Sequence, residues 1–562
     1  MKFFNFKIKQ VKFTHPAKNI LGWINKEIDR PKSKLIFMAV SAGLANALLL
    51  AIVNHAAEML SNNNIHMHYL VIYMILLGVF IYAQYFVFSE AFKMVEEGLF
   101  NIRVRITEKI RLTNLDFIES IGYNYVCNSL TQDSSIVSQN APIVFKSILS
   151  AILVFFTMLY VAYLSIFGFI IGISAISLAF FVFLKRRDLI VKEIDYSIER
   201  EIMFFNIFEQ TFKGFKEIKI NSAKSRDLFK HQEMLAKEVE HYKGLAAIDE
   251  IFVLSFSEIF FYSLFAIIIF IWPLFVDVSP ILVVKLITSF LFLTIGPLDW
   301  VLNLLPKLLK MEISIINLRN LEETIDAAIA DNIEDNVPDQ ETIDFHSLSV
   351  KNVRFEYIDS SGKPTFAIGP INFEILYNEI VFIIGSNGSG KSTLLKVLVG
   401  LYYFCEGTIL LNGIPVNKKN YANYREYFSA VFSDFHIFER IYGVKDLNED
   451  QVRNQLVKMG LENNTKFLDG QFTNINLSTG QRKRLAYIAA MLEDKPIYIL
   501  DEWAADQDPN FRKYFYDVLL PDLRNRGKTV IAVSHDDRYF YAADRLLKFD
   551  NGVITGEIIN RR

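Results

Sequence analysis

Six apolar runs lie between residues 35 and 304, and each is close to the roughly 20 residues that a helix needs to cross a bilayer. The runs cover residues 35–53, 69–88, 143–164, 166–184, 251–275 and 281–304. Apolar segments that cross a bilayer are helices, because a helix satisfies its backbone hydrogen bonds within the segment. The runs therefore predict a polytopic α-helical membrane domain with six transmembrane helices, which we place at residues 35–319.

The links between the runs predict how the chain is threaded. The runs form three pairs, and the links within pairs, residues 55–68, Ser165 and 276–280, contain no Lys or Arg. The links between pairs, residues 89–142 and 185–250, are long and basic. The positive-inside rule therefore places the long links and both termini in the cytosol. Helical periodicity in these links predicts cytosolic extensions of the spans, each with a short transverse helix at its turn, near residues 115–125 and 221–227.

Residues 1–34 are expected to form a cytosolic N-terminus, because they hold nine Lys and Arg residues against two acidic ones. One helical face of this segment is apolar, and it contains Ile20, Leu21, Trp23, Ile24 and Ile28. This pattern predicts an amphipathic elbow helix that lies in the headgroup layer before the first span. A frayed tail is the alternative interpretation.

Composition agrees with a membrane protein that carries a soluble part. The chain is 52% hydrophobic, with a mean hydropathy of +0.25 and a net charge of −3, so it has no basic field that would attract nucleic acid. Residues 320–350 contain no Lys or Arg and many acidic residues. We expect an acidic linker at residues 320–344 and a soluble domain at residues 345–562.

A glycine turn near the start of this soluble domain has the pattern of a phosphate-binding loop. An apolar strand, residues 380–384, leads into the turn, and helical spacing follows it. The nine residues of the loop are Gly385, Ser386, Asn387, Gly388, Ser389, Gly390, Lys391, Ser392 and Thr393. Backbone N–H groups and the helix dipole favour the phosphates of ATP here, Lys391 is expected to reach the β- and γ-phosphates, and Ser392 is expected to ligate Mg²⁺. A glycine turn with a chance GKS is the alternative.

Two later strands also end in residues suited to ATP hydrolysis. Residues 497–500 end at Asp501 and Glu502, which we assign to the Mg²⁺ shell and to general-base catalysis. Residues 529–533 are followed by His535, which is placed to contact the γ-phosphate. Upstream, the alternating strand at residues 353–357 ends in Tyr357, which could stack on the adenine ring. Each residue alone could be structural, but three strands that end in phosphate-directed groups favour a nucleotide site.

Between these strands, Leu477, Ser478, Thr479, Gly480 and Gln481 open a helix whose N-terminus suits an anion. This LSTGQ sequence, with the phosphate loop before it and Asp501 and Glu502 after it, resembles the signature of the ATP-binding cassette (ABC) family. With six spans on the same chain, the whole sequence resembles a half-size ABC exporter with an α/β P-loop cassette. In that family, the signature of one subunit faces the phosphate loop of the other. The resemblance therefore implies a homodimer, with a heterodimer as the less favoured alternative.

Longer strings narrow the resemblance. FSAVFSDFHIF at residues 428–438, LSTGQRKRLA and DEWAADQDP resemble the bacterial cyclic-peptide exporters, a group that includes transporters of lipopeptides, peptide siderophores and a lasso-peptide microcin. Two departures from the general ABC pattern stand out. Ser433 replaces the glutamine that ligates Mg²⁺ in most cassettes, so a bridging water or Asp434 is an alternative ligand. Trp503, Ala504 and Ala505 replace the usual Pro, Thr and Ser, which leaves Asp508 as the residue expected to signal across the dimer.

The resemblance implies ATP-driven export across the bacterial inner membrane, with both termini and the ATP-binding domain in the cytosol. The expected cargo is a cyclic, lasso or otherwise bulky amphipathic peptide, or a peptide siderophore precursor. Glu258 in the fifth run is a candidate substrate-facing or proton-exchanging carboxylate, because a charge within a span is costly. Tyr262, on the same run, is the second candidate substrate residue. A buried helix contact is the alternative for Glu258. A lipid or glycolipid flippase and an ATP-gated receptor or channel are the competing functions.

Overall fold

The structure is a computed structural model of the chain. It describes residues 16–28, 30–61, 66–275, 278–294, 297, 300, 304–330, 344–358, 363–444 and 447–560. The first part of the expected N-terminal segment, residues 1–15, and most of the expected linker, residues 331–343, lie outside the described residues.

The described residues form two compact units. The helical unit comes from Val11–Glu108 and Asn124–Glu323, and the sheet unit comes from Lys109–Tyr123 and Thr324–Arg562. Each is described by itself. The helical unit contains long helices and no β-strand among its described residues, whereas all described strands belong to the sheet unit. The predicted combination of a helical domain and an α/β domain is therefore confirmed.

Four helical segments of the helical unit are long and apolar enough to cross a membrane. They are residues Ser33–Leu60, Met67–Arg111, Tyr125–Leu164 and Ile166–Arg186. The first, second and fourth segments lie in α2 (Ser33–Ser61), α3 (Met67–Arg111) and α7 (Ile166–Lys213). The third is a continuous helical stretch made of α5 (Tyr123–Asn128), the π-helical η1 (Ser129–Asp133) and α6 (Ser134–Leu164). The first four predicted spans are therefore present as helices of sufficient length.

The fifth and sixth predicted spans are not confirmed at full length. Among the described residues, the apolar helices in these two runs are Tyr262–Leu274 and Pro280–Leu293, and both are shorter than a crossing requires. The first combines the end of α9 (Ser222–Ala266) with η2 (Ile267–Ile271) and η3 (Trp272–Leu274). Helix α9 also covers residues 251–261 of the fifth run, so this run is helical as far as η3, which contains Pro273. The second lies in α10 (Pro280–Thr294), and parts of the sixth run lie outside the described residues.

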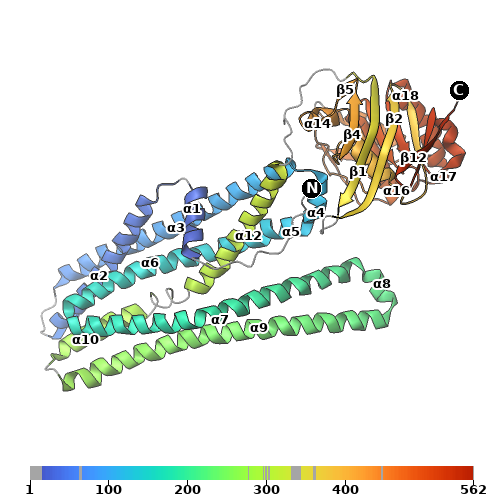
Figure 1. The fold of residues 1–562 in the computed structure, drawn as a ribbon. Coiled ribbons are helices and arrows are strands. Elements are labelled where there is room, and N and C mark those ends of the chain that lie inside the picture. The colour runs from blue at the N-terminus through green and yellow to red at the C-terminus, as the bar shows by residue number, and fades with distance from the viewer. Residues whose placement is uncertain are drawn as a thin grey trace. The chain divides into compact units, whose positions relative to one another are not determined.

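The predicted helical extension of the spans is clearest in α7 and α9. Figure 1 shows these two helices side by side along their length, joined at one end by the short helix α8 (Phe215–Ile220). Salt bridges join them at Arg186–Asp249, Arg200–Glu238 and Lys243–Glu201, with distances of 3.0, 3.2 and 2.8 Å. The short helix expected near residues 221–227 is α8, which ends at Ile220. Residues 221–227 instead begin α9, whose first turn is capped by Asn221.

The predicted elbow helix is α1 (Pro16–Glu27), and its apolar face packs on protein. Trp23 is buried, and its ring lies against Gly98 of α3. The buried carboxylate of Glu27 accepts two hydrogen bonds of 2.9 Å from the guanidinium of Arg105. Arg105 also donates to Glu322 of α12 (Leu304–Ala330) at 2.6 and 3.1 Å. Over Pro16–Glu27 the described part of the segment is therefore a helix, and its apolar face packs on protein instead of facing lipid.

Helix α12 also changes the interpretation of the acidic segment. It continues to Ala330, and Leu321 and Ile325 are fully buried on it. The first part of the expected linker is therefore helical, and its acidic residues accompany buried apolar ones.

The sheet unit is built on a six-stranded sheet in the order β12-β11-β3-β10-β9-β6. The strands are β3 (Ile380–Ile384), β6 (Phe428–Val431), β9 (Ile497–Asp501), β10 (Thr529–Val533), β11 (Arg545–Asp550) and β12 (Val553–Ile559). All neighbours pair in parallel except β11 and β12. Ile380 and Phe382 enter one buried apolar cluster and Val381 and Ile383 enter another, so β3 is covered on both faces.

An antiparallel sheet and several helices cover this central sheet. The antiparallel sheet has the order β2-β1-β4-β5, formed by β1 (Ser347–Ile358), β2 (Pro364–Leu376), β4 (Glu406–Leu411) and β5 (Ile414–Pro415). A small hairpin pairs β7 (Phe467–Leu468) with β8 (Gln471–Phe472). The helices are α13 (Lys391–Leu398), α14 (Tyr421–Arg425), α15 (Glu449–Lys458), α16 (Thr479–Leu492), α17 (Pro509–Tyr514), the π-helical η4 (Phe515–Leu519), α18 (Leu520–Asn525) and the 3-10 helix η5 (Asp537–Ala542).

One helix of the sheet unit comes from far upstream. This helix, α4 (Leu115–Ile121), is the transverse helix expected near residues 115–125, and Leu115 packs against the apolar cluster under the antiparallel sheet. The helix at this turn therefore packs on the core of the sheet unit.

Candidate nucleotide site

The candidate site lies at the carboxyl ends of three parallel neighbours, β3, β10 and β9. Parallel strands end at one edge of a sheet, so the residues that follow them come together there. The phosphate loop follows β3, Glu502 follows Asp501 at the end of β9, and His535 lies two residues beyond β10.

The phosphate loop turns on glycines that could not carry a side chain. A Cβ on Gly385 would lie 1.9 Å from the carbonyl oxygen of Phe549, and Gly390 has a φ of +101° at the position that caps α13. Lys391 begins α13, and its ammonium donates to the carbonyl oxygens of Gly385 and Ser386 at 3.1 and 2.7 Å. The loop therefore curls around the lysine of the helix that it opens.

Burial lowers the pKa of Lys391, while the nearby carboxylates of Glu502 and Asp501 act in the opposite direction. The side chain is 5% exposed, so a phosphate beside it would meet a poorly hydrated cation. Charge-assisted hydrogen bonds to phosphate are strong in such a setting.

Two buried oxygen atoms at the site have no hydrogen-bond partner among the described residues. They are Ser389 Oγ in the phosphate loop and Asp501 Oδ1 at the end of β9. Asp501 is 1% exposed, and its other carboxylate oxygen accepts a 3.4 Å hydrogen bond from the backbone N–H of Ser433. A buried carboxylate oxygen without a donor is suited to a hard cation. Asp501 Oδ1 is therefore suited to Mg²⁺, and the observed contact of Ser433 with Asp501 uses its backbone N–H.

Glu502 and His535 face each other at the same edge. The Nε2 atom of His535 lies 2.9 Å from Oε1 of Glu502, and both side chains are slightly more than one-third exposed. Glu502 has a φ of +49°, in the left-handed region that a non-glycine residue seldom adopts. This conformation places the carboxylate beside the imidazole and open to solvent, where a water molecule can reach it.

Tyr357 lies next to the helix that follows the phosphate loop. Its hydroxyl is 3.4 Å from Oγ1 of Thr393, and its half-buried ring meets Phe355 and Tyr402 edge to face. The strand thus holds an aromatic ring at the border of the site, as an adenine-stacking residue requires.

The signature segment begins α16 with a complete capping box. Ser478 accepts from the backbone N–H of Gln481, and the Gln481 side chain accepts from the backbone N–H of Ser478. The carbonyl oxygen of Gly480 accepts from the side chain of Gln507 at 3.0 Å. No hydrogen bond among the described residues joins Ser478 or Gly480 to the phosphate loop.

Asp508 caps α17 and contacts α16. It accepts from the backbone N–H of Phe511 at 3.0 Å and from Arg484 at 2.8 Å. The Phe511 N–H, followed by Arg484, lowers the pKa of Asp508. Asp508 therefore remains charged while it ties the segment after Glu502 to the signature helix.

Sequence reasoning missed the partners of α4 in the sheet unit. Glu119 accepts a 2.6 Å hydrogen bond from the buried hydroxyl of Tyr402 and pairs with Lys396 of α13 at 3.2 Å. Lys396 lies 3.6 Å from Asp434, next to Ser433, and Tyr402 stacks on Phe355. One side chain of α4 thus touches the phosphate-loop helix and the aromatic cluster of Tyr357. The sequence signal that could have indicated a polar partner here is the group of tyrosines that begins at Tyr402.

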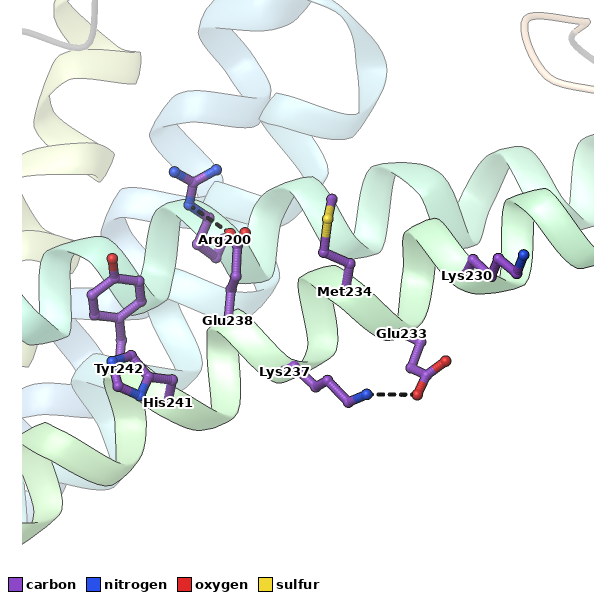
Figure 2. A pocket seen from close by; sticks show the side chains of 8 residues that line it. All are labelled: Arg200, Lys230, Glu233, Met234, Lys237, Glu238, His241 and Tyr242. Atoms are coloured by element: carbon purple, nitrogen blue, oxygen red, sulfur yellow. Dashed lines mark hydrogen bonds and ion pairs between the residues drawn. The ribbon is translucent and has the colours of Figure 1, made fainter.

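The candidate substrate residues belong to the other unit. Glu258 and Tyr262 are both exposed on α9, so a buried helix contact for Glu258 is not observed. A pocket of about 550 Å³ lies elsewhere on the α7 and α9 pair and is lined by Arg200, Lys230, Glu233, Met234, Lys237, Glu238, His241 and Tyr242. Figure 2 shows its charged side chains largely paired with each other, and none of them belongs to the predicted sites.

A phosphate loop, an Asp-Glu strand end and a facing histidine on one parallel sheet define a P-loop ATPase domain. Residues 368–505 match the family described as ABC transporter. Over 482 residues the chain is 33% identical to ATP-binding protein SyrD of Pseudomonas syringae pv. syringae, covering 81% of this chain and 82% of that protein. The chain therefore belongs to the ABC transporter family.

Other relatives match over shorter segments. The ATP-dependent lipid A-core flippase of Haemophilus influenzae (strain 86-028NP) is 31% identical over 37% of each chain. The subtilin transport ATP-binding protein SpaT of Bacillus subtilis is 31% identical over 38% of this chain and 36% of that one. A solved bacterial Atm1-family ABC exporter with ATP bound shares the fold, with a TM-score of 0.73 and 16% identity over 97% of this chain and 95% of that chain. The chain is an ABC exporter, and its enzymatic activity is ATP hydrolysis coupled to transport.

Proposed function

We propose that this exporter works as a homodimer that uses ATP to move a bulky amphipathic peptide out of the bacterial cytosol. The observation that carries the dimer is the incomplete site of a single chain. The phosphate loop, Asp501, Glu502 and His535 meet at one sheet edge, while Ser478 and Gly480 have no hydrogen bond to that loop. ABC exporters of this fold work as dimers, and a second copy would supply the signature to each phosphate loop.

Each site residue then has a role in hydrolysis. Lys391 binds the β- and γ-phosphates with the N–H groups of residues 385–393, and Tyr357 stacks on the adenine. Glu502 orients the attacking water and accepts its proton, while His535 contacts the γ-phosphate and holds the Glu502 carboxylate. Ser478, Gly480 and Gln481 of the second copy close the site, and Asp508 signals across the dimer.

Mg²⁺ would be held by Ser392 and Asp501, and when bound it neutralises the charge that develops on the phosphates. Asp501 Oδ1 supports this assignment because it is buried without a partner among the described residues. We keep Ser433 as a candidate ligand, because its backbone N–H donates to the other oxygen of Asp501 and so holds this residue beside the proposed metal position.

We place six spans in the bacterial inner membrane, with both termini and the sheet unit in the cytosol. Four helices have the required length, and basic residues in the long links support this orientation. The two remaining spans would combine the apolar helices Tyr262–Leu274 and Pro280–Leu293 with their flanking residues. We retain residues 35–319 as the membrane domain and residues 345–562 as the cassette.

A peptide cargo is supported by the motif resemblance to cyclic-peptide exporters and by the subtilin transport relative. A cyclic or lasso peptide, or a peptide siderophore precursor, suits spans rich in aromatic residues, and Glu258 and Tyr262 would contact it. A lipid or glycolipid flippase remains the second candidate, because lipid A-core flippases also match the chain over 37% of its length.

The catalytic assignment is tested with Glu502→Gln in the full-length protein. Loss of the general base is expected to lower ATP turnover by about 10²- to 10⁴-fold while ATP still binds. Glu462→Gln, the same substitution at an exposed glutamate of the sheet unit, is the matched control and should turn over normally. Normal turnover of the Glu502 variant would remove our catalytic assignment.

Transport is tested in inside-out vesicles with a labelled lasso peptide and, in a parallel arm, a labelled lipid. An exporter accumulates peptide with ATP but not with a non-hydrolysable analogue or with Glu502→Gln. Transfer of lipid alone would favour the flippase, and passage of solute with the analogue would favour a gated channel. Tyr262→Phe should alter the peptide concentration for half-maximal uptake, whereas Tyr163→Phe, at an exposed tyrosine of α6, should not.

A further inference from the structure

We propose that Lys483 is a positioning residue of the ATPase site, which holds the main chain of Glu502 so that its carboxylate meets His535. The inference rests on the proposed catalytic role of Glu502. It assigns a function to a residue of the signature helix that lies outside the LSTGQ segment itself.

Lys483 lies in the second turn of α16 and is 3% exposed. Its ammonium donates to the backbone carbonyl oxygen of Glu502 at 2.7 Å and pairs with Oδ2 of Asp506 at 2.6 Å. A buried ammonium is costly unless it is paired and hydrogen-bonded. The turn at residues 502–506 supplies both partners, so satisfaction of this charge depends on the conformation of the catalytic segment.

The conformation that Lys483 contacts is an unfavourable one for glutamate. Glu502 has a φ of +49°, in the left-handed region that residues other than glycine seldom adopt. Such a conformation persists only where its surroundings enforce it. The Glu502 carbonyl oxygen also accepts from the backbone N–H of Ala505 at 3.2 Å, so two donors converge on it.

The same turn of α16 also holds the next residue. The indole N–H of Trp503 donates to the carbonyl oxygen of Lys483 at 2.9 Å, and Trp503 is 1% exposed. Lys483 therefore contacts residue 502 with its side chain and residue 503 with its main chain. These contacts hold the main chain at residue 502, from which the Glu502 carboxylate reaches to 2.9 Å from His535 Nε2.

If Lys483 served only to stabilise the fold, its ion pair with Asp506 would be sufficient. The hydrogen bond to the Glu502 carbonyl also ties the signature helix to the main chain that carries the catalytic carboxylate. A displacement of about 1 Å at a reacting group can cost about 10²-fold in rate. We therefore expect Lys483→Met to act on the rate of the chemical step rather than on ATP affinity.

The test measures Mg-ATP turnover and ATP binding by full-length protein reconstituted in lipid vesicles. Lys483→Met should lower kcat by about 10- to 100-fold with KM and the ATP Kd changed by less than about 2-fold. Lys483→Arg, which keeps the charge and the donors, should recover most of kcat. An unchanged kcat in Lys483→Met, or an equal loss in Lys483→Arg, would overturn the proposal.

Two further variants separate positioning from folding. Lys483→Met with Asp506→Asn leaves no unpaired buried charge, so it should fold and still show the loss of kcat. In a Glu502→Gln background, Lys483→Met should leave the residual turnover unchanged, because the residue acts through Glu502. A further loss in that background would contradict this path, whereas normal turnover of Glu502→Gln alone would instead contradict the proposed function.

Discussion

Replacement of Trp503 by alanine should destabilise the sheet unit strongly. Trp503 stands where the general ABC pattern has proline, and it is 1% exposed. Its ring centroid lies 4.6 Å from that of Phe515 and 5.3 Å from that of Tyr487. Alanine would remove these contacts, leave a cavity between three helical segments, and delete the hydrogen bond to Lys483.

The expected loss follows from the burial of the side chain. Truncation of a buried tryptophan to alanine costs about 3–5 kcal/mol. For a domain of this size, each kcal/mol lowers the Tm by about 2–4 °C, so the Tm should fall by roughly 6–20 °C. Trp503→Phe keeps an aromatic ring and loses the indole donor, so it should cost about 1–2 kcal/mol.

The assay is calorimetry of nucleotide-free, full-length protein in detergent micelles, followed at the unfolding transition of the sheet unit. Phe438→Ala is the matched control, because Phe438 is an aromatic residue of the same unit that is 61% exposed. Its Tm should change by less than about 2 °C. A Trp503→Ala transition within about 2 °C of wild type would refute the packing argument, and so would an equal fall in the control.

Three other substitutions test separate contacts. Tyr402→Phe removes the hydroxyl that donates to Glu119, so amide hydrogen exchange in α4 should become about 10-fold faster. Unchanged exchange would show that this hydrogen bond does not stabilise the packing of α4 on the sheet unit. Asp501→Asn should raise the Mg²⁺ concentration for half-maximal ATP turnover by about 10-fold or more, whereas an unaltered Mg²⁺ titration would remove this residue from the metal site. Gly385→Ala should abolish ATP binding, because the alanine Cβ would lie 1.9 Å from the Phe549 carbonyl oxygen. Retained binding of a fluorescent ATP analogue would contradict this, because the phosphate loop would then have moved to accept the methyl group.

The three strand ends of the site could be predicted from sequence because their signals are local. Each of the three strands is a short apolar run that is followed closely by a functional residue. One run leads into the glycine loop, one into Asp501 and Glu502, and one ends two residues before His535, so each run identifies the strand and the functional residue together. The parallel order of the strands then brings these residues to one edge without further information. The same reasoning predicted the aromatic ring of Tyr357 but not its neighbours.

Contacts between distant segments could not be predicted in this way. Lys483 has the sequence pattern of an exposed helical lysine, and only the fold reveals that it is buried on the carbonyl oxygen of Glu502. Glu119 is separated from Tyr402 by most of the helical unit in sequence. The sequence pattern predicts a role for the side chain of Ser433, whereas the contact that the structure shows is from its backbone N–H to Asp501. Such contacts depend on tertiary placement, which residue type and spacing do not encode.

Helix α16 gives a physical reason why the two sites of the proposed homodimer would close together. Its N-terminus carries Ser478 and Gly480, which would meet the nucleotide of the second copy, and its second turn carries Lys483 and Arg484, which contact the segment after β9 of its own site. Gln507 joins both ends of this arrangement, because it donates to the Gly480 carbonyl oxygen and accepts from Arg484 at 2.8 Å. A helix is rigid over two turns, so ATP that orders the N-terminus at one site restricts the catalytic segment at the other. Closure around a single nucleotide would therefore leave one catalytic segment less well ordered than closure around two.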